Sequence, residues 1–208
     1  MLVLSLCNKF CPDKLPVIPG NRIDDGADGE IFTITNVDDK VIKFGVLYDP
    51  FDSDSIHDKN YNNIQSVIDV IINTQPRAYV RVFSQGYLGT YCRDILYGRQ
   101  DFILYYYIME KLKKISEDER KVFHSILCHE DRGIKKDYSL DELNKILCGL
   151  SLGLDFDKDA VMLFYSDIKE APLLHLDLHT RNIMKDDTNS FKLVDLERIK
   201  LENENVKA

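Results

Sequence analysis

Alternating apolar and polar positions in the first half of the chain are typical of β-strands separated by turns. Residues 23–31 contain two short strand-like runs around a glycine-containing turn, and 40–45 form an apolar run with one internal lysine. We expect a turn at 38–39 between them. A helix is expected over 60–73. Residues 101–112 are rich in β-branched and aromatic side chains, which predicts a buried strand.

The second half shows the helical period instead. Ser-x-x-Glu capping boxes at 116–119 and 139–142 predict the starts of two helices, the second ending at Leu147 or Leu150. A third helix is expected over 157–169 and is followed by Pro172. Its predicted buried stripe is Ala160, Val161, Leu163, Phe164 and Ile168. The chain is therefore expected to be an α+β protein, with a small antiparallel N-terminal sheet and a mostly helical C-terminal half.

Three oxygen-bearing side chains near the C-terminus have a spacing that suits phosphoryl transfer. Asp177 can accept a proton from an attacking hydroxyl. Asn182 offers an amide oxygen, and Asp195 follows an apolar strand as a carboxylate, so the pair can hold Mg²⁺ on a polyphosphate. Phosphoryl transfer asks the protein mainly for positioning and for neutralisation of charge. These residues therefore form a candidate catalytic and metal-binding set.

The motif His-x-Asp-x-x-x-x-Asn, followed by an apolar strand ending in Asp, resembles the catalytic and metal loops of the protein-kinase-like superfamily. His179 and the ending Asp195-Leu196-Glu197 are more similar to its aminoglycoside-phosphotransferase, atypical and phage branches than to kinases with Asp-Phe-Gly. The resemblance implies a two-lobe fold. Residues 1–110 would carry the glycine loop, lysine strand and hinge strand, and 111–208 would form a reduced C-terminal lobe.

The same resemblance implies nucleotide-binding roles in the first half. Gly26 and Gly29 match part of the kinase glycine-rich loop, whose first glycine is replaced here by Asp24, and would let the backbone approach phosphate oxygens. Lys43, in Val-Ile-Lys, resembles the lysine that bonds the α- and β-phosphates. Two alternatives stay open: a simple hairpin turn for the glycines, and a solvent-side position for the lysine.

Residues 101–112 resemble the strand that leads into the kinase hinge. By this match Met109 is the gatekeeper, while main-chain groups of Glu110 and Leu112 bind adenine; a buried core strand is the other interpretation. In the family this lysine is normally paired with a Glu on the helix that follows the lysine strand. The helix expected over 60–73 contains no Glu, which leaves Gln65 or Asp69 as the candidate partner of the lysine.

Further residues of the C-terminal motifs have alternative roles. His175 is expected to pack as a brace for the catalytic loop. His179 either donates a hydrogen bond to the γ-phosphate, which makes it a candidate catalytic residue, or caps the turn. Glu197 is a metal-binding group, a loop-bracing group or a surface residue.

Composition narrows the function classes and the compartment. The net charge of −8 disfavours nonspecific nucleic-acid binding and an anionic membrane surface. No segment approaches the roughly 20 apolar residues of a membrane span. The apolar start, 1–7, lacks the basic residues and length of a signal peptide and is expected to be a strand or packing arm. Five scattered cysteines fit a reducing compartment, so a cytoplasmic location is expected, including that of a host cell.

Together these features predict an ATP- and Mg²⁺-dependent phosphotransferase, a minimal serine/threonine protein kinase similar to compact phage or bacterial-effector kinases. Only 11 residues follow Glu197, which favours an open acceptor site and hence a protein hydroxyl, of a host protein among others. The alternatives are a pseudokinase acting as a binding module, a small-molecule kinase and a nucleotidyltransferase. The acceptor, the pathway and the oligomeric state stay open.

Overall fold

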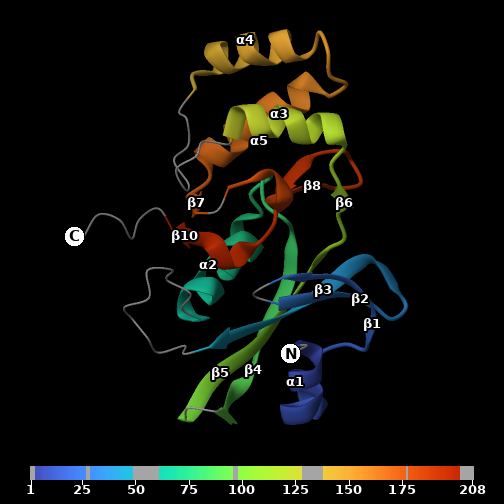
Figure 1. Cartoon of the computed structure of the whole chain (residues 1–208), viewed down its shortest axis with the longest axis vertical. Coiled ribbons are helices and arrows are strands. Elements are labelled where there is room, and N and C mark those ends of the chain that lie inside the picture. The colour runs from blue at the N-terminus through green and yellow to red at the C-terminus, as the bar shows by residue number, and fades with distance from the viewer. Residues whose placement is uncertain are drawn as a thin grey trace, which may run out of the picture. The chain divides into compact units, whose positions relative to one another are not determined.

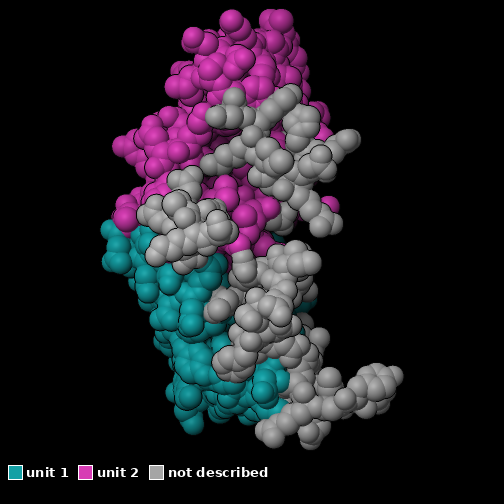
Figure 2. All heavy atoms as spheres, turned by 90° about the vertical axis from the view of Figure 1, so that its left-hand side faces the viewer, with its two compact units in different colours: residues 1–73, 81–111 teal, residues 74–80, 112–208 magenta. Residues whose placement is uncertain are grey.

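The structure is a computed structural model that describes residues 3–26, 29–48, 61–95, 98–127, 138–176 and 178–201. The chain divides into two compact units, one made of 1–73 and 81–111 and the other of 74–80 and 112–208 (Figure 2). Within the described ranges, no helix combines the length and the apolar character that crossing a membrane requires.

The first unit is built on a five-stranded antiparallel sheet in the order β1-β2-β3-β5-β4 (Figure 1). Its strands are β1 (Pro19–Gly26), β2 (Gly29–Ile34), β3 (Val37–Tyr48), β4 (Val82–Ile95) and β5 (Gly98–Glu110). The turn predicted at 38–39 is wrong, because β3 already begins at Val37. The chain turns at 35–36 instead, where Asn36 adopts the left-handed conformation (φ 63°) that Asn tolerates well.

One face of this sheet is covered by helix α1 (Val3–Phe10), with the short 3₁₀ helix η1 (Pro12–Lys14) after it. Val3, Leu6 and Cys7 of the helix pack against alternate residues of the strands, among them Phe44 and Leu104. The strand predicted for the N-terminus is therefore wrong, while its role as a packing arm is confirmed. The apolar positions 3, 6 and 7 follow the helical period and so place one face on the sheet.

The opposite face of the sheet carries helix α2 (Tyr61–Thr74). Its buried residues are Ile64, Val67, Ile68 and Ile71. The Gln85 side chain, on β4, donates hydrogen bonds to the Gln65 carbonyl oxygen and to Oδ1 of Asp69, 3.1 and 2.6 Å away. Because neighbouring positions of a strand point to opposite faces, α1 and α2 contact alternate residues of the same strands.

The described part of the second unit contains the three predicted helices, and two of them begin at the predicted capping boxes. They are α3 (Glu117–Leu127), α4 (Leu140–Leu150) and α5 (Lys158–Glu170). Reciprocal hydrogen bonds join Ser116 to Glu119 before α3 and Ser139 to Glu142 at the start of α4. Two of the five predicted stripe positions of α5 are not buried: Leu163 is 49% exposed and Ala160 is partly exposed, whereas Tyr165, which was not predicted, is buried.

Short strands and 3₁₀ turns complete this unit. They are β6 (Lys113–Lys114), β7 (Leu173–His175), η2 (Thr180–Asn182), β8 (Ile183–Lys185), β9 (Phe191–Leu193), η3 (Leu196–Arg198) and β10 (Ile199–Leu201). Strands β6, β8 and β9 form one small sheet, and β7 pairs antiparallel with β10. The predicted fold class, an α+β protein with a small antiparallel N-terminal sheet and a mostly helical C-terminal half, is confirmed.

Candidate active site

The second unit brings two of the predicted site residues together through the main chain. Strands β8 and β9 pair so that Ile183 faces Leu193, and one step further the Val194 N–H donates to the Asn182 carbonyl at 2.9 Å. Asp195 follows Val194 directly. The predicted metal ligands therefore lie on adjacent positions of one hydrogen-bonded ladder, although they are 13 positions apart in the sequence.

His175 binds the other main-chain polar group of Val194. Its Nε2 lies 2.9 Å from the Val194 carbonyl oxygen, and because a carbonyl can only accept, Nε2 must carry the proton. The side chain is almost fully buried. Val194 is thus fixed through both its N–H and its C=O, and the predicted brace role of His175 agrees with this geometry.

Asp195 has a backbone conformation that few residues adopt. Its φ of 64° and ψ of 61° lie in the left-handed region, where a side chain other than Gly, Asn or Asp is strained. The Asp195 side chain does not cap the 3₁₀ turn η3 that it precedes. Asp is one of the few residues besides Gly that adopt this conformation at modest cost, so most other side chains would be unfavourable at this position.

The predicted base, Asp177, lies outside the described residues, but both of its flanks are fixed. On one side the Leu176 N–H donates to the Arg198 carbonyl at 2.7 Å, which extends the pairing of β7 with β10. On the other side His179 Nδ1 accepts a hydrogen bond from the Arg181 N–H at 3.1 Å and caps η2. This hydrogen bond supports the capping interpretation of His179, while its role at the γ-phosphate stays a prediction.

Glu197 is not a surface residue, because only 2% of it is exposed. It lies in η3, immediately between Asp195 and β10. The metal-binding and loop-bracing interpretations stay predictions.

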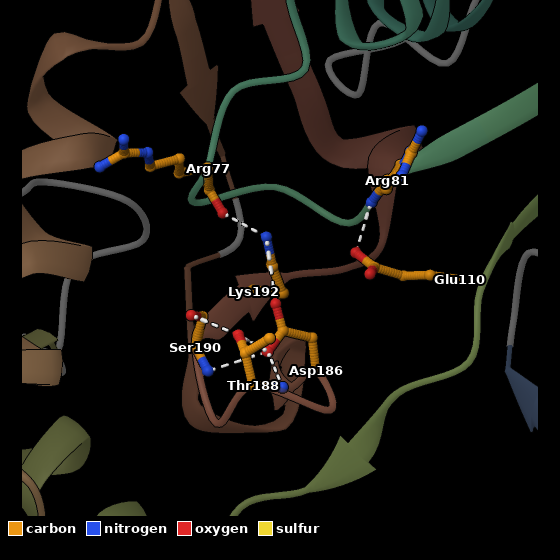
Figure 3. A network of polar contacts seen from close by, with 7 residues as sticks. All are labelled: Arg77, Arg81, Glu110, Asp186, Thr188, Ser190 and Lys192. Carbon is orange, nitrogen blue, oxygen red and sulfur yellow. Dashed lines mark hydrogen bonds and ion pairs between the residues drawn. The ribbon is translucent and has the colours of Figure 1, made fainter. Parts of the chain in front are cut away.

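Strand β9 is supported on its second edge by the segment between α2 and β4. Leu193 donates its N–H to the Ala78 carbonyl at 2.7 Å and accepts from the Val80 N–H at 2.9 Å. Lys192 Nζ donates to the Arg77 carbonyl at 2.8 Å and pairs with Asp186, whose carboxylate also closes the β8–β9 turn (Figure 3). The strand that delivers Asp195 is therefore paired on both edges.

In the first unit the glycine turn and the lysine lie next to each other. Gly26 and Gly29 are the closing pair of the β1–β2 hairpin. A Cβ on Gly29 would lie 2.4 Å from the Phe44 carbonyl oxygen and 3.2 Å from Cε of Lys43, so the site requires a glycine. Lys43 itself is only 8% exposed, which rules out the solvent-side alternative for this lysine.

The hinge residues predicted from 101–112 lie at the end of β5. Met109 is buried in the core, in agreement with the core-strand interpretation. The Glu110 N–H donates to the Arg81 carbonyl at 3.0 Å, and its carboxylate accepts from the Arg81 N–H at 2.7 Å (Figure 3). Leu112 is the first residue of the chain's return to the second unit. Adenine binding by Glu110 and Leu112 stays a prediction.

Neither candidate on α2 pairs with Lys43 in the described part of the chain. The Gln65 side chain is exposed, and this residue contributes its main-chain carbonyl to Gln85. The Asp69 carboxylate accepts from the Gln85 amide. The Lys43 ammonium instead lies over the ring of Tyr107, 5.7 Å from its centroid. Sequence patterns gave no sign of Tyr107 or Gln85, because only strand register brings these side chains together.

The metal chemistry open to these residues is limited. Among the described residues, no group of three or more His, Cys, Asp or Glu side chains is gathered as a metal site. One amide and one carboxylate suit a cation that takes its remaining ligands from water and phosphate. Mg²⁺ is the cation that typically binds in this way.

Comparison with known proteins gives structural matches alone. No protein-family model and no curated protein matches the chain. The solved structures that match include the ROP18 kinase domain in complex with AMP-PNP and sucrose, at 11% identity and a TM-score of 0.47. Another is WbdD with the kinase inhibitor LY294002, at 14% identity and a TM-score of 0.40. Each alignment covers 88% of this chain, but 52% of the first protein and 33% of the second. At these values we base no functional conclusion on the likeness.

Proposed function

We propose that this protein is an ATP-dependent phosphotransferase of the protein-kinase-like type, and specifically a minimal serine/threonine protein kinase. The observation that carries the proposal is the Asn182–Val194–Asp195 arrangement. A main-chain hydrogen bond joins Asn182 to Val194, His175 bonds to the Val194 carbonyl, and Asp195, the next residue, has the left-handed conformation. These contacts fix the backbone that carries both candidate ligands, which supports a common role for their side chains.

The proposed reaction is an in-line transfer of the γ-phosphoryl group. The acceptor hydroxyl oxygen forms a bond to the γ-phosphorus, the bond from that phosphorus to the β–γ bridging oxygen breaks, and ADP leaves with the electron pair. Asp177 orients the hydroxyl and takes its proton late in the transfer. Asn182 and Asp195 would hold Mg²⁺, which neutralises phosphate charge when bound.

In the first unit, Lys43 and the Gly26–Gly29 backbone are proposed to bind the phosphates. Burial of Lys43 supports this role, since an almost fully buried ammonium calls for an anionic or aromatic partner. Gly29 presents bare backbone beside Cε of this lysine. Main-chain groups of Glu110 and Leu112 are proposed to bind adenine. The acceptor is proposed to be a protein hydroxyl rather than a nucleic acid or a membrane component.

A labelling experiment tests this proposal against its alternatives. The purified protein is incubated with Mg²⁺, cell lysate and ATP labelled at either the γ- or the α-phosphate. We expect γ-label, and no α-label, on protein. Alpha-label on protein would indicate nucleotidyl transfer, γ-label confined to small molecules a small-molecule kinase, and nucleotide binding without transfer a pseudokinase.

Two variants and a control make the source of the label certain. Asp177→Asn should lower kcat roughly 10²-fold or more, because proton acceptance is lost and the acceptor is misoriented. Lys43→Met should lower kcat/KM as well. Asp187→Asn is the control, because this exposed carboxylate pairs with Lys113 at the surface and should matter little. Equal labelling by all these proteins would mean that a contaminating kinase is the source.

A further inference from the structure

Lys43 is the proposed phosphate ligand of the first unit, and α2 does not reach it through a carboxylate. Gln65 and Asp69 are the two residues of α2 that were predicted to pair with Lys43. The Gln65 main-chain carbonyl and the Asp69 carboxylate both accept hydrogen bonds from the side chain of Gln85. Gln85 belongs to β4, whereas Lys43 belongs to β3, with β5 between these strands. The helix is therefore bonded to the far side of β5 from the lysine.

The register of the strands nevertheless places Gln85 and Lys43 in one row, with Tyr107 between them. Lys43 of β3 lies directly opposite Tyr107 of β5, and Tyr107 lies directly opposite Gln85 of β4. Directly opposed residues of antiparallel strands point to the same face, with Cβ atoms about 4.5–5.5 Å apart. The three side chains thus form one row across the sheet, on the face that α2 covers.

Tyr107 has the properties of a positioning group for an ammonium. It is only 1% exposed, so its ring is held in the core of the sheet. The Lys43 ammonium lies over this ring, 5.7 Å from the centroid, while Cε of the lysine lies near Gly29. An ammonium is attracted to an aromatic face within about 6 Å, and more strongly where water is excluded.

We propose that Tyr107 is a positioning residue for Lys43 and takes the place of the helix carboxylate expected from the family resemblance. Helix α2 then acts on the lysine through Gln85 and Tyr107, and not by an ion pair. This inference rests on the proposed function, since it concerns the phosphate-binding lysine of that site.

The test replaces the ring and keeps a matched control. Tyr107→Phe retains the aromatic face and should stay within twofold of wild type in kcat/KM. Tyr107→Leu removes it and should lower kcat/KM and ATP affinity about threefold to tenfold. Tyr105→Leu is the control, because Tyr105 lies on the same strand and the same face and is equally buried. It should cost comparable stability in a thermal melt, with nucleotide affinity unchanged.

Two further measurements separate positioning from a general structural role. In a Lys43→Met background, Tyr107→Leu should cause no additional loss of ATP affinity by calorimetry, because the two changes remove one interaction. Asp69→Asn keeps an oxygen acceptor for Gln85 but removes the charge, so activity should stay within twofold of wild type. A direct ion pair with Lys43 would make this variant resemble Lys43→Met.

The outcomes distinguish the two proposals. Wild-type kinetics for Tyr107→Leu, or an equal fall for Tyr105→Leu, would overturn the positioning role while the proposed function stands, provided that Lys43→Met and Asp177→Asn are impaired. Wild-type activity in Lys43→Met would overturn the proposed role of the lysine itself. A protein that neither binds nucleotide nor transfers phosphate would overturn both proposals.

Discussion

The two units hold their candidate site residues by different means. In the first unit Lys43 belongs to a twelve-residue strand with partners on both sides, and many ladder hydrogen bonds set its position. In the second unit Asn182 and Asp195 belong to 3₁₀ turns and ends of three-residue strands, and a few identifiable bonds set theirs. Losing one contact in the sheet therefore leaves many others to hold Lys43, whereas losing one hydrogen bond in the second unit removes much of what holds Asn182 and Asp195.

This difference predicts that changes in the two units affect different properties. A change within the sheet should lower the free energy of unfolding and leave the chemistry of the folded molecules largely intact. A change at Asn182 or Asp195 should lower the rate of phosphoryl transfer and leave the free energy of unfolding largely unchanged. The predictions at Asp195 and Gly45 test this contrast, and the one at Asp186 concerns a small contribution to stability in the second unit.

The largest effect is expected at Asp195. Replacement by Ala or Gly removes the proposed metal ligand, and both should lower Mg²⁺-dependent transfer at least 10²-fold. Their stabilities should differ, because Gly accepts a φ of 64° freely while Ala is strained there by about 1 kcal/mol. Activity assays and urea denaturation of the same preparations measure both properties. Transfer within threefold of wild type in either variant would show that the metal assignment is wrong.

An intermediate effect is expected at Gly45, in the sheet. A Cβ there would lie 2.1 Å from Cζ of Tyr105, its cross-strand partner, whose ring is buried. Gly45→Ala should therefore lower the free energy of unfolding by about 1–3 kcal/mol through overpacking. Transfer per folded molecule should change little. Urea denaturation gives the first quantity, and kcat at a temperature where the variant is folded gives the second.

Gly149→Ala is the matched control for Gly45→Ala. Gly149 lies within helix α4, and a Cβ there would meet no atom within 4 Å. Ala is favoured over Gly in a helix by about 0.8–1 kcal/mol, so this variant should be more stable than wild type. Adding Tyr105→Leu to Gly45→Ala should restore part of its lost stability, since the clash involves that ring. A Gly45→Ala protein as stable as wild type would refute the close packing of this pair.

The smallest effect is expected from Asp186, in the β8–β9 turn. Burial alone would raise the pKa of this carboxyl, but hydrogen bonds from Thr188 and Ser190 and the charge of Lys192 together lower it below its ordinary value. A lowered folded-state pKa stabilises the fold above the ordinary pKa near 4, and this contribution is lost as the pH falls through the folded-state value. We expect a loss of about 0.2–1 kcal/mol, the size of a surface ion pair.

The measurement for Asp186 is urea denaturation at pH 7 and pH 3 for wild type and Asp186→Asn. The difference between the two proteins should be larger at pH 7, because Asn mimics the protonated acid. A difference that does not depend on pH would mean that the charge of this turn contributes nothing to stability.

Sequence patterns were informative wherever a local rule decides the structure. The capping boxes at Ser116 and Ser139 predicted helix starts, because a cap depends on residues three positions apart. The glycine turn before Gly29 and the lysine strand followed from composition and alternation. Asn182 and Asp195 were also predicted as a pair, and their adjacent positions on one ladder agree with a common role, which stays a prediction.

Other features depend on which strands become neighbours, and the sequence does not contain that information locally. Leu163 was placed in the buried stripe of α5 and Tyr165 was left out of it, because the helical period alone does not fix the direction of the buried face. The partner of Lys43 was predicted on helix α2. In the structure, strand register places the Tyr107 ring beside the Lys43 ammonium, and Asp69 accepts a hydrogen bond from Gln85 instead. The sequence by itself determined which groups could carry the chemistry. Tertiary structure decided which groups hold them in place, because the register of distant strands sets these contacts.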